Sequence, residues 1–225
     1  TYNNENTTGT EVTLSSWIGS GLEVPFSESF ASTSATKDLW TIVDANNDWD
    51  GKATGNGIWK LNSSGYMRYT YHTANAADDY LISPLLAFEG GKTYKATFEV
   101  LTSNANNTPE NLKIKMGAGV LPENQTVTLA VFPGLKISPS FVVKEFYFTV
   151  EESNDYNLSF YCYSEKDMNF VHIRNLNITE YASIPAEVTD VVINAVSGNE
   201  LKARLAWKNP ALNSINMPLK AEDFN

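Results

Sequence analysis

The chain has 225 residues, with 26 acidic against 16 basic side chains and a formal net charge of −10 at pH 7. This excess of carboxylates argues against a nucleic-acid partner, because phosphates are neutralised by lysine and arginine. The single cysteine, Cys162, excludes an internal disulfide, and no apolar run reaches the ~18–20 residues of a membrane span. No signal peptide is visible at Thr1, so we expect a mature chain or a segment of a longer one.

Alternation of apolar and polar residues is the main structural signal. In chain order it is visible in residues 66–72, 94–100, 112–116, 146–150 and 158–163. Clusters of Asn, Gly, Pro and Asp separate these segments. A period of two with turn-rich connections is typical of half-buried antiparallel strands. We therefore predict an all-β protein in which residues 23–182 form a jelly-roll β-sandwich.

The two ends differ from this middle part. Residues 183–225 contain a proline-led strand pattern at 185–192 and a second strand pattern at 201–208 that carries Trp207. This order resembles the opening of a fibronectin type III domain, but the segment is shorter than the ~100 residues of such a sandwich. Residues 1–22 are similar to the closing strand of the same domain type, or to a linker. We predict incomplete fibronectin type III segments on both sides of the jelly roll.

Four motifs in the middle part occur in an order typical of a known family. They are Pro-Phe-Ser-Glu-Ser-Phe at 25–30, Trp-Thr-Ile-Val-Asp-Ala-Asn-Asn-Asp at 40–48, Asp-Asp-Tyr-Leu-Ile-Ser-Pro at 78–84 followed by Gly-Gly-Lys-Thr-Tyr at 90–94, and Val-His-Ile-Arg-Asn-Leu-Asn-Ile at 171–178. Over residues 23–181 the chain resembles the cleaved-adhesin, or choice-of-anchor J, jelly-roll family. Its best-known members are the haemagglutinin/adhesin domains attached to gingipain proteases.

The resemblance implies a calcium-containing sandwich on a secreted or cell-surface bacterial protein. Modules of this family adhere to host proteins, haem proteins or glycans, or serve as accessory domains, and they often alternate with fibronectin type III domains. The chain departs from the family in its last strand, where two adjacent acidic residues are often found and Arg174 and Asn175 stand here. A calcium site that relied on that acidic pair would lose negative charge.

One loop carries Asx residues at every second position: Asp44, Asn46, Asp48 and Asp50. Calcium takes roughly six to eight oxygen ligands, so alternating Asx side chains in a tight loop can converge on one ion. The loop is not an EF-hand, because Gly51 is misplaced and Gly55 stands where the bidentate glutamate belongs. The alternative interpretation is a solvated Asx turn.

A second candidate cation set consists of Glu28, Asp79 and Asn175. In sandwich modules of the resembled family a structural ion often clips the first strand to the last. A glutamate on the first strand and an Asx on the closing strand would suit such an ion. The alternative is that Glu28 is a surface residue and Asp79 caps a turn. Calcium at either set would be structural, because an ion that binds only the folded state adds stability by mass action.

The candidate ligand contacts are aromatic side chains on the polar faces of strands. Tyr147, Tyr161 and Tyr163 lie opposite the apolar faces of their strands, and Trp49 lies beside the Asx loop. We predict that they contribute to a concave binding surface. In residues 66–72, Met67, Tyr69 and Tyr71 share one face, which we assign to the core; an exposed stacking platform is the alternative. Trp40 is also assigned to the core.

Catalysis finds little support in the sequence. Neither a His-Glu-x-x-His zinc motif nor a Gly-x-Ser-x-Gly elbow is present. Cys162 and His172 could lie on neighbouring strands, but Cys162 is on the apolar face with Leu158 and Phe160, where a thiol is usually inert. We therefore predict that the chain is not an enzyme.

The sequence thus predicts a non-catalytic adhesion or carbohydrate- or protein-binding module of an extracellular, multi-domain bacterial surface protein. Its expected partners are a glycan or a host or matrix protein, together with neighbouring domains of the same chain. An alternative is an accessory or structural spacer domain of a secreted protease or glycoside hydrolase.

Overall fold

The computed structural model describes residues 20–49, 51, 56–103, 108–182, 184–196 and 202–219. Within these residues the chain forms β-strands and two short 3-10 turns, η1 (Lys37–Leu39) and η2 (Pro122–Asn124). The predicted all-β class is therefore confirmed. In the same residues there is no helix long and apolar enough to cross a membrane.

The first sheet, which we call sheet I, is built around the long strand β12 (Asn154–Cys162). β12 pairs antiparallel with β9 on one edge and with β6 and β7 at other points along its length. The remaining strands extend the sheet from these partners. The members besides β12 are β1 (Leu22–Glu23), β3 (Thr41–Asp44), β6 (Asp79–Ile82), β7 (Leu86–Phe88), β9 (Glu110–Gly117) and β10 (Val127–Leu135).

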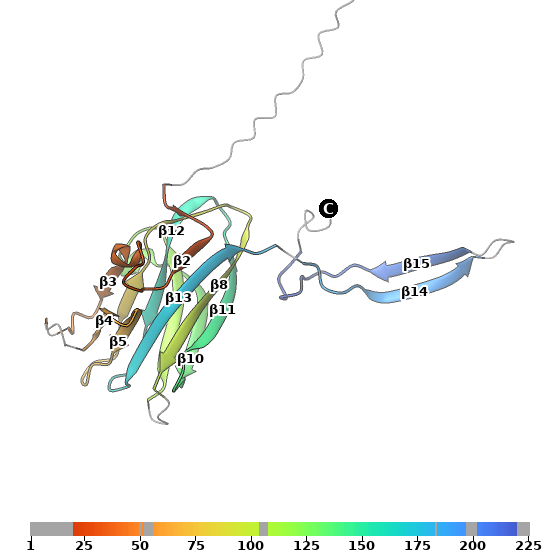
Figure 1. Cartoon of the computed structure of the whole chain (residues 1–225). Helices are drawn as coiled ribbons and strands as arrows, with labels where there is room; N and C mark the ends of the chain where they lie inside the picture. The colour runs from red at the N-terminus through yellow and green to blue at the C-terminus, as the bar shows by residue number, and fades with distance from the viewer. Residues whose placement is uncertain are drawn as a thin grey trace, which may run out of the picture.

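The second sheet, sheet II, is centred on β13 (Phe170–Glu180), which pairs antiparallel with β2, β5 and β8. Sheets I and II form the two layers of the sandwich (Figure 1). This arrangement of strands confirms the jelly-roll prediction. The members of sheet II besides β13 are β2 (Phe26–Glu28), β4 (Ile58–Asn62), β5 (Tyr66–Thr70), β8 (Thr93–Thr102) and β11 (Val142–Thr149).

The core lies between the sheets and is rich in aromatic side chains. In β8 every second residue is buried, so the strand presents one apolar face inward. Phe98 of β8 meets Phe160 of β12 edge to face, with ring centroids 5.1 Å apart, and this contact joins the two sheets. Burying a side chain of this size contributes about 1.5–3 kcal/mol.

Of the apolar face predicted in residues 66–72, Met67 and Tyr69 pack into the core, whereas Tyr71 follows the end of β5 and is only half-buried. Met67 and Tyr69 are buried, and the Tyr69 ring lies 5.8 Å from that of Trp59. Trp40 is only partly buried, but it packs against the core through Phe30, at a centroid distance of 5.0 Å.

A β-bulge interrupts the pairing of β13 with β8 between Arg174 and Asn177. Asn175 in this bulge has a φ of 51°, in the left-handed region that asparagine tolerates better than most residues. The bulge therefore redirects the side chains at the position where the resembled family often carries acidic residues.

Beyond the sandwich, β14 (Thr189–Val196) and β15 (Lys202–Lys208) form a two-stranded antiparallel hairpin. Figure 1 shows the hairpin projecting away from sheets I and II. The sequence predicted two strands for the start of a fibronectin type III segment, and the hairpin has two. The assignment to that domain type stays a prediction. The predicted segment at residues 1–22 lies almost entirely outside the described residues.

Candidate functional site

The outer face of sheet I gathers three tyrosines and two lysines from β6, β9, β12 and the position directly after β12. Because Leu158, Phe160 and Cys162 of β12 point into the core, the alternate residues of this strand lie on the outer face. Tyr161 is in register with Tyr80 of β6 on one side and with Lys113 of β9 on the other. We call the resulting set the tyrosine–lysine platform: Tyr80, Lys113, Lys115, Tyr161 and Tyr163.

The three rings of the platform form a stacked row. Tyr80 and Tyr161 have ring centroids 4.3 Å apart and ring planes 16° apart, and Tyr161 and Tyr163 have centroids 5.8 Å apart and planes 25° apart. Stacking uses part of the apolar ring surface within the row, so the hydroxyl groups become important for any ligand. Tyr80 is buried, whereas Tyr161 and Tyr163 are half-buried.

Both lysines lie over the rings. The Lys113 Nζ atom is 4.2 Å from the Tyr163 ring centroid, and the Lys115 Nζ atom is 5.4 Å from the centroids of both Tyr80 and Tyr161. An ammonium group within about 6 Å of an aromatic face is attracted by the ring quadrupole. These contacts hold two positive charges at fixed places on the row.

The electrostatic environment keeps the phenol groups protonated. Burial raises the pKa of Tyr161 above its ordinary value, and the neighbouring Asp78 carboxylate raises it further. Burial also raises the pKa of Tyr80, with Asp78 again adding to the effect. The hydroxyl groups of Tyr80 and Tyr161 therefore keep their protons, and can donate hydrogen bonds, even above the pH at which an ordinary tyrosine ionises.

The pKa of Lys115 is lowered, first by burial and then by the charge of Lys113. Asp78 acts in the opposite direction, and its effect is the smallest of the three. The two ammonium groups therefore repel each other without full compensation from the nearest carboxylate.

The platform includes two of the four aromatic residues predicted to contact ligand. Tyr161 and Tyr163 lie together, but Tyr147 is on β11 of sheet II, where its ring packs edge to face against Tyr181 at 5.0 Å. Trp49 is 42% exposed in the loop after β3, and its backbone N–H donates to Asp44. The structure thus distributes the predicted contacts over three places.

Sequence reasoning missed Tyr80, Lys113 and Lys115. Both lysines occupy the polar positions of the alternating segment 112–116, and Tyr80 stands in the motif at 78–84. The alternation therefore indicated an outer face for the lysines. It did not indicate that β6 and β9 flank β12, because strand order is not encoded in the period of a single strand.

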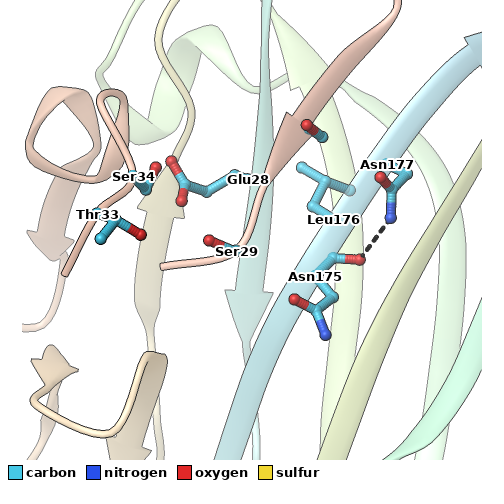
Figure 2. A pocket seen from close by; sticks show the side chains of 8 residues that line it. Glu28, Ser29, Thr33, Ser34, Asn175, Leu176 and Asn177 are labelled. Atoms are coloured by element: carbon cyan, nitrogen blue, oxygen red, sulfur yellow. Dashed lines mark hydrogen bonds between the residues drawn. The ribbon is translucent and has the colours of Figure 1, made fainter. Parts of the chain in front are cut away.

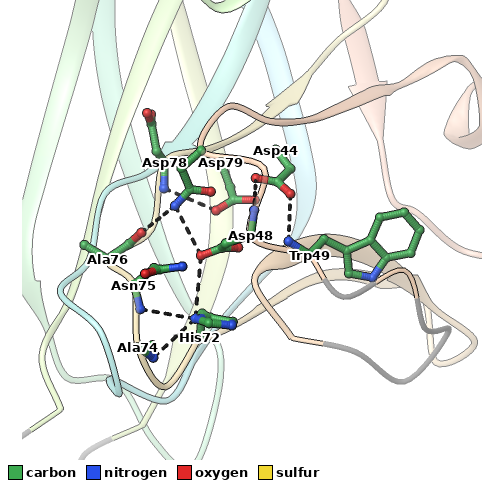
Figure 3. A network of polar contacts seen from close by, with 10 residues as sticks. Asp44, Asp48, Trp49, His72, Ala74, Asn75, Ala76, Asp78 and Asp79 are labelled. Carbon is green, nitrogen blue, oxygen red and sulfur yellow. Dashed lines mark hydrogen bonds and ion pairs between the residues drawn. The ribbon is translucent and has the colours of Figure 1, made fainter.

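Three carboxylates, from Asp44, Asp48 and Asp79, lie near one another where β3 and β6 pair (Figure 3). The Asp44 carboxylate accepts the backbone N–H groups of Asp48 and Trp49, at 3.2 and 2.9 Å. Asp44 thus holds the loop closed through residues four and five positions further along the chain, whereas an Asx turn bonds the backbone two residues on. Asn46 donates to Asp48 Oδ2 at 3.2 Å, and Asp50 lies outside the described residues.

The other two carboxylates retain unused oxygens. Asp79 is fully buried, and neither its Oδ1 nor the Oδ1 of Asp48 has a hydrogen-bond partner among the described residues. Burial raises the pKa of Asp79 to about 8, and the charges of Asp44 and Asp48 add to the increase. Negative charge at this edge is therefore poorly compensated by the surrounding protein.

Local backbone geometry brings Asp48 into this position. Gly57 has a φ of 76°, and a Cβ atom at this residue would collide with the Asp48 carboxylate. The Asp48 Oδ2 atom lies 3.8 Å from Nδ1 of His72, and that nitrogen accepts the backbone N–H groups of Ala74 and Asn75 (Figure 3). Because Nδ1 already acts as an acceptor, it does not donate to Asp48.

Glu28 lies elsewhere, in a cleft of about 380 Å³ between β2, the following loop and the bulge of β13. The Glu28 side chain is buried, and its oxygens accept the Phe30 N–H and the Thr36 hydroxyl, both at 2.5 Å. Figure 2 shows the carboxylate directed toward Ser34, whereas the Asn175 amide points away from it.

Asn175 is engaged with a different partner. Its Nδ2 atom donates to Glu99 Oε1 at 2.9 Å, and Arg174 Nε donates to Glu99 Oε2 at 2.8 Å. The two residues that stand where the family often has an acidic pair thus share one carboxylate partner. The predicted set of Glu28, Asp79 and Asn175 is therefore not brought together, because Asp79 joins Asp44 and Asp48 instead.

The two candidate cation sites differ in how well they would fit a resident calcium ion. Across the described ranges no three His, Cys, Asp or Glu side chains are already arranged to hold a metal ion. Asp48 and Asp79, beside Asp44, nevertheless offer buried, unpartnered carboxylate oxygens, which are the ligands that calcium prefers. Glu28 offers one carboxylate whose two oxygens are already used. The residues at the β3–β6 edge fit the ion better.

Cys162 and His172 lie on different sheets. Cys162 is buried in the core and its thiol pKa is raised by burial. His172 stacks between Phe170 and Tyr66 on β13 and β5, with centroid distances of 4.3 and 4.4 Å. Burial lowers the pKa of His172 to about 4. The two side chains do not form a nucleophile–base pair.

No family model matches the chain, and no curated protein matches its sequence. Among solved structures, the K1 cleaved adhesin domain of Lys-gingipain from Porphyromonas gingivalis W83 is 22% identical, with a TM-score of 0.50, 69% of this chain covered and 98% of that chain. The K3 cleaved adhesin domain of the same protein is 16% identical, with a TM-score of 0.49, 68% of this chain covered and 98% of that chain.

A further solved structure, of a CBM4 module, is 12% identical with a TM-score of 0.46, and the match covers 67% of this chain and 92% of that chain. The class defined by the two packed sheets is a jelly-roll β-sandwich. More particularly, the chain has the fold of the K1 cleaved adhesin domain. The resemblance predicted from the four sequence motifs is thus confirmed at the level of the fold.

Proposed function

We propose that this chain is a non-catalytic, extracellular binding module that holds a glycan on the tyrosine–lysine platform. The observation that carries the proposal is the stacked row of Tyr80, Tyr161 and Tyr163 with two ammonium groups fixed over its rings. Four of the five side chains are half-buried, so they are accessible from solvent.

The chemistry of this surface suits a sugar. A sugar presents both C–H patches and many hydroxyl groups, and the row offers aromatic carbon next to phenol and ammonium donors. Amphipathic rings of this kind give large contact areas at low cost in side-chain entropy. The platform also lies on paired strands of sheet I, which keep its side chains in place before a ligand arrives.

The experiment that tests this proposal is affinity electrophoresis and titration calorimetry against a panel of soluble bacterial, plant and animal polysaccharides. Tyr161→Ala should weaken binding about tenfold, because removing one central aromatic contact typically costs about 1–2 kcal/mol. Tyr147→Ala is the matched control, since Tyr147 is equally half-buried but belongs to sheet II.

The result that overturns the proposal is a correctly folded wild-type chain that binds none of the polysaccharides. A reduction of affinity in Tyr147→Ala equal to that in Tyr161→Ala would also overturn it, because the binding surface would then not be the platform. Circular dichroism and melting temperature establish that both variants are folded.

We also propose that Asp44, Asp48 and Asp79 hold a structural calcium ion, with loop carbonyl groups completing the coordination. The support comes from the unused oxygens of Asp48 and Asp79 and from the mutual repulsion that adds to the raised pKa of Asp79. When bound, the ion would neutralise these carboxylates and tie the Asx loop to β6. Asn46 and Asp50 stay predicted as further ligands, and Glu28 with Asn175 stays a separate prediction.

A further inference from the structure

The two lysines of the platform lack the carboxylate partners found at a comparable place in sheet II. There, Lys95 Nζ lies 5.6 Å from the Tyr147 ring centroid, and it also forms an ion pair with Glu145 at 2.9 Å. Among the described residues, no ion pair involves Lys113 or Lys115. The same lysine–tyrosine arrangement is thus neutralised on one sheet and left charged on the other.

This uncompensated charge occurs on a chain whose net charge is −10. Lys113 and Lys115 are two residues apart on one face of β9, so their ammonium groups repel each other. The chain has many carboxylates, but Asp78 is the one whose charge raises the pKa of Lys115, and this effect is smaller than the lowering by burial and by Lys113. An anionic ligand group would supply the counter-charge that the protein itself does not place there.

The polar groups around the lysines are also donors. The phenol groups of Tyr80 and Tyr161 are protonated at physiological pH, as in an ordinary tyrosine, and their raised pKa values extend this to higher pH. A surface rich in donors and positive charge suits a ligand group that only accepts hydrogen bonds, such as a carboxylate or a sulfate.

We infer that the ligand of the platform is an acidic glycan, one whose sugars carry carboxylate or sulfate groups. The inference rests on the proposed function, because it assigns the chemical class of the glycan bound there. The negative charge of Asp78 influences Tyr161 and Lys115, and it would repel an anionic group placed there. We therefore expect the anionic group nearest Lys113 and Tyr163, where the Lys113 ammonium lies 4.2 Å from the Tyr163 ring centroid.

The test compares each acidic polysaccharide with its own neutral form. Polygalacturonate and hyaluronate are paired with their methyl esters, and chondroitin sulfate is paired with its desulfated methyl ester. Each acidic form should bind with at least the affinity of its neutral form. For at least one pair, the affinity for the acidic form should be about tenfold higher at low salt. The difference should shrink as salt is raised, because screening weakens exposed charge contacts.

Two variants locate the effect. In the Lys113→Gln/Lys115→Gln double variant the ratio of affinities for the acidic and neutral forms should fall to about one, since the expected charge contacts are removed. Lys95→Gln is the matched control, because it removes a lysine that lies over a tyrosine on sheet II, and its ratio should equal that of the wild type.

The outcomes separate this inference from the proposed function. Binding of both forms with equal affinity, or of neutral forms only, overturns the acidic-glycan inference and leaves glycan binding in place. Binding of no polysaccharide overturns both. A charge preference that survives the double lysine variant would overturn the assignment of the anionic group to this platform.

Discussion

Glu110, at the start of β9, is a carboxylic acid buried at the edge of the core. Its Oε1 atom accepts the Asn169 N–H at 2.9 Å, and its Oε2 atom has no hydrogen-bond partner among the described residues. Burial raises the pKa of Glu110 from 4.5 to about 7, and the nearby Ser164 opposes this only in part. The folded chain therefore holds a proton here that the unfolded chain releases at lower pH.

This residue should make the free energy of unfolding depend on pH. Between about pH 4.5 and 7 the folded state binds more protons than the unfolded state, so stability falls as pH rises through this window. The decrease amounts to roughly 3 kcal/mol, from about 1.4 kcal/mol per pH unit. Glu110→Gln keeps an acceptor for Asn169 and cannot ionise, so its stability should decrease less than that of the wild type from about pH 5 to about pH 8.

The measurement is urea unfolding of both chains at several pH values, with the difference between wild type and variant as the readout. Taking the difference removes contributions from other titrating groups, such as Asp79. Parallel stability profiles for the two chains would show that Glu110 does not hold its proton in this range.

At the scale of elements, the pairing of β3 with β6 creates the candidate cation site. Asp44 and Asp79 are in register at this edge, and the Asx loop folds back over them. Neither strand alone carries the set, because Asp79 is more than thirty positions away from Asp44 and Asp48 in the sequence. The effect of calcium on stability should therefore depend on this edge.

Calcium should raise the melting temperature relative to EGTA. At about one hundred times the dissociation constant, a ligand adds about 2.7 kcal/mol, which corresponds to roughly 5–10 °C for a chain of this size. Asp79→Asn should abolish the shift. In EGTA the same variant should melt no lower than the wild type, because the Asp79 carboxyl, with a pKa of about 8, is mostly uncharged near pH 7 and asparagine is uncharged too.

Glu28→Gln is the matched control for this measurement, because it changes the other predicted cation site. The calcium shift should survive in this variant. A shift that disappears in Glu28→Gln but persists in Asp79→Asn would assign the ion to the cleft between β2 and β13. No shift in the wild type at millimolar calcium would discard both sites.

At the scale of the whole molecule, sheets I and II share one core, and the β14–β15 hairpin does not join either sheet. Apolar side chains of the hairpin are exposed, with Ile193 at 69% and Trp207 at 51%. A two-stranded hairpin by itself is marginally stable in water. We therefore expect the sandwich, and not the hairpin, to account for most of the free energy of unfolding of the chain.

Removal of residues 183–225 should leave the melting temperature of the sandwich within about 3 °C of the full chain, because the hairpin pairs with no strand of either sheet. Differential scanning calorimetry of the two chains measures this. The truncation also removes the hydrogen bond between the hydroxyl groups of Tyr181 and Ser214, at 3.3 Å, which is exposed and therefore contributes little. A decrease of about 10 °C or more would show that the segment is part of the folding unit.

The sequence alone indicated the all-β class, and it also indicated the strands and inward faces of the segments that alternate clearly. The alternation in residues 94–100 and 158–163 places Phe98 and Phe160 in the core, and the structure joins them at 5.1 Å. A strand pattern is readable from sequence because side chains alternate with a fixed period of two. The four motifs also indicated the jelly-roll fold, which the structure of K1 matches.

Only the tertiary structure decided which side chains meet. It placed Tyr161 beside Tyr80 and Lys113, separated Tyr147 from them, and moved Asp79 from the Glu28 set to the Asp44–Asp48 set. These partners are far apart in sequence, and their proximity depends on strand order, register and one bulge in β13. Local periodicity specifies the face on which a side chain lies, whereas long-range pairing specifies its neighbours.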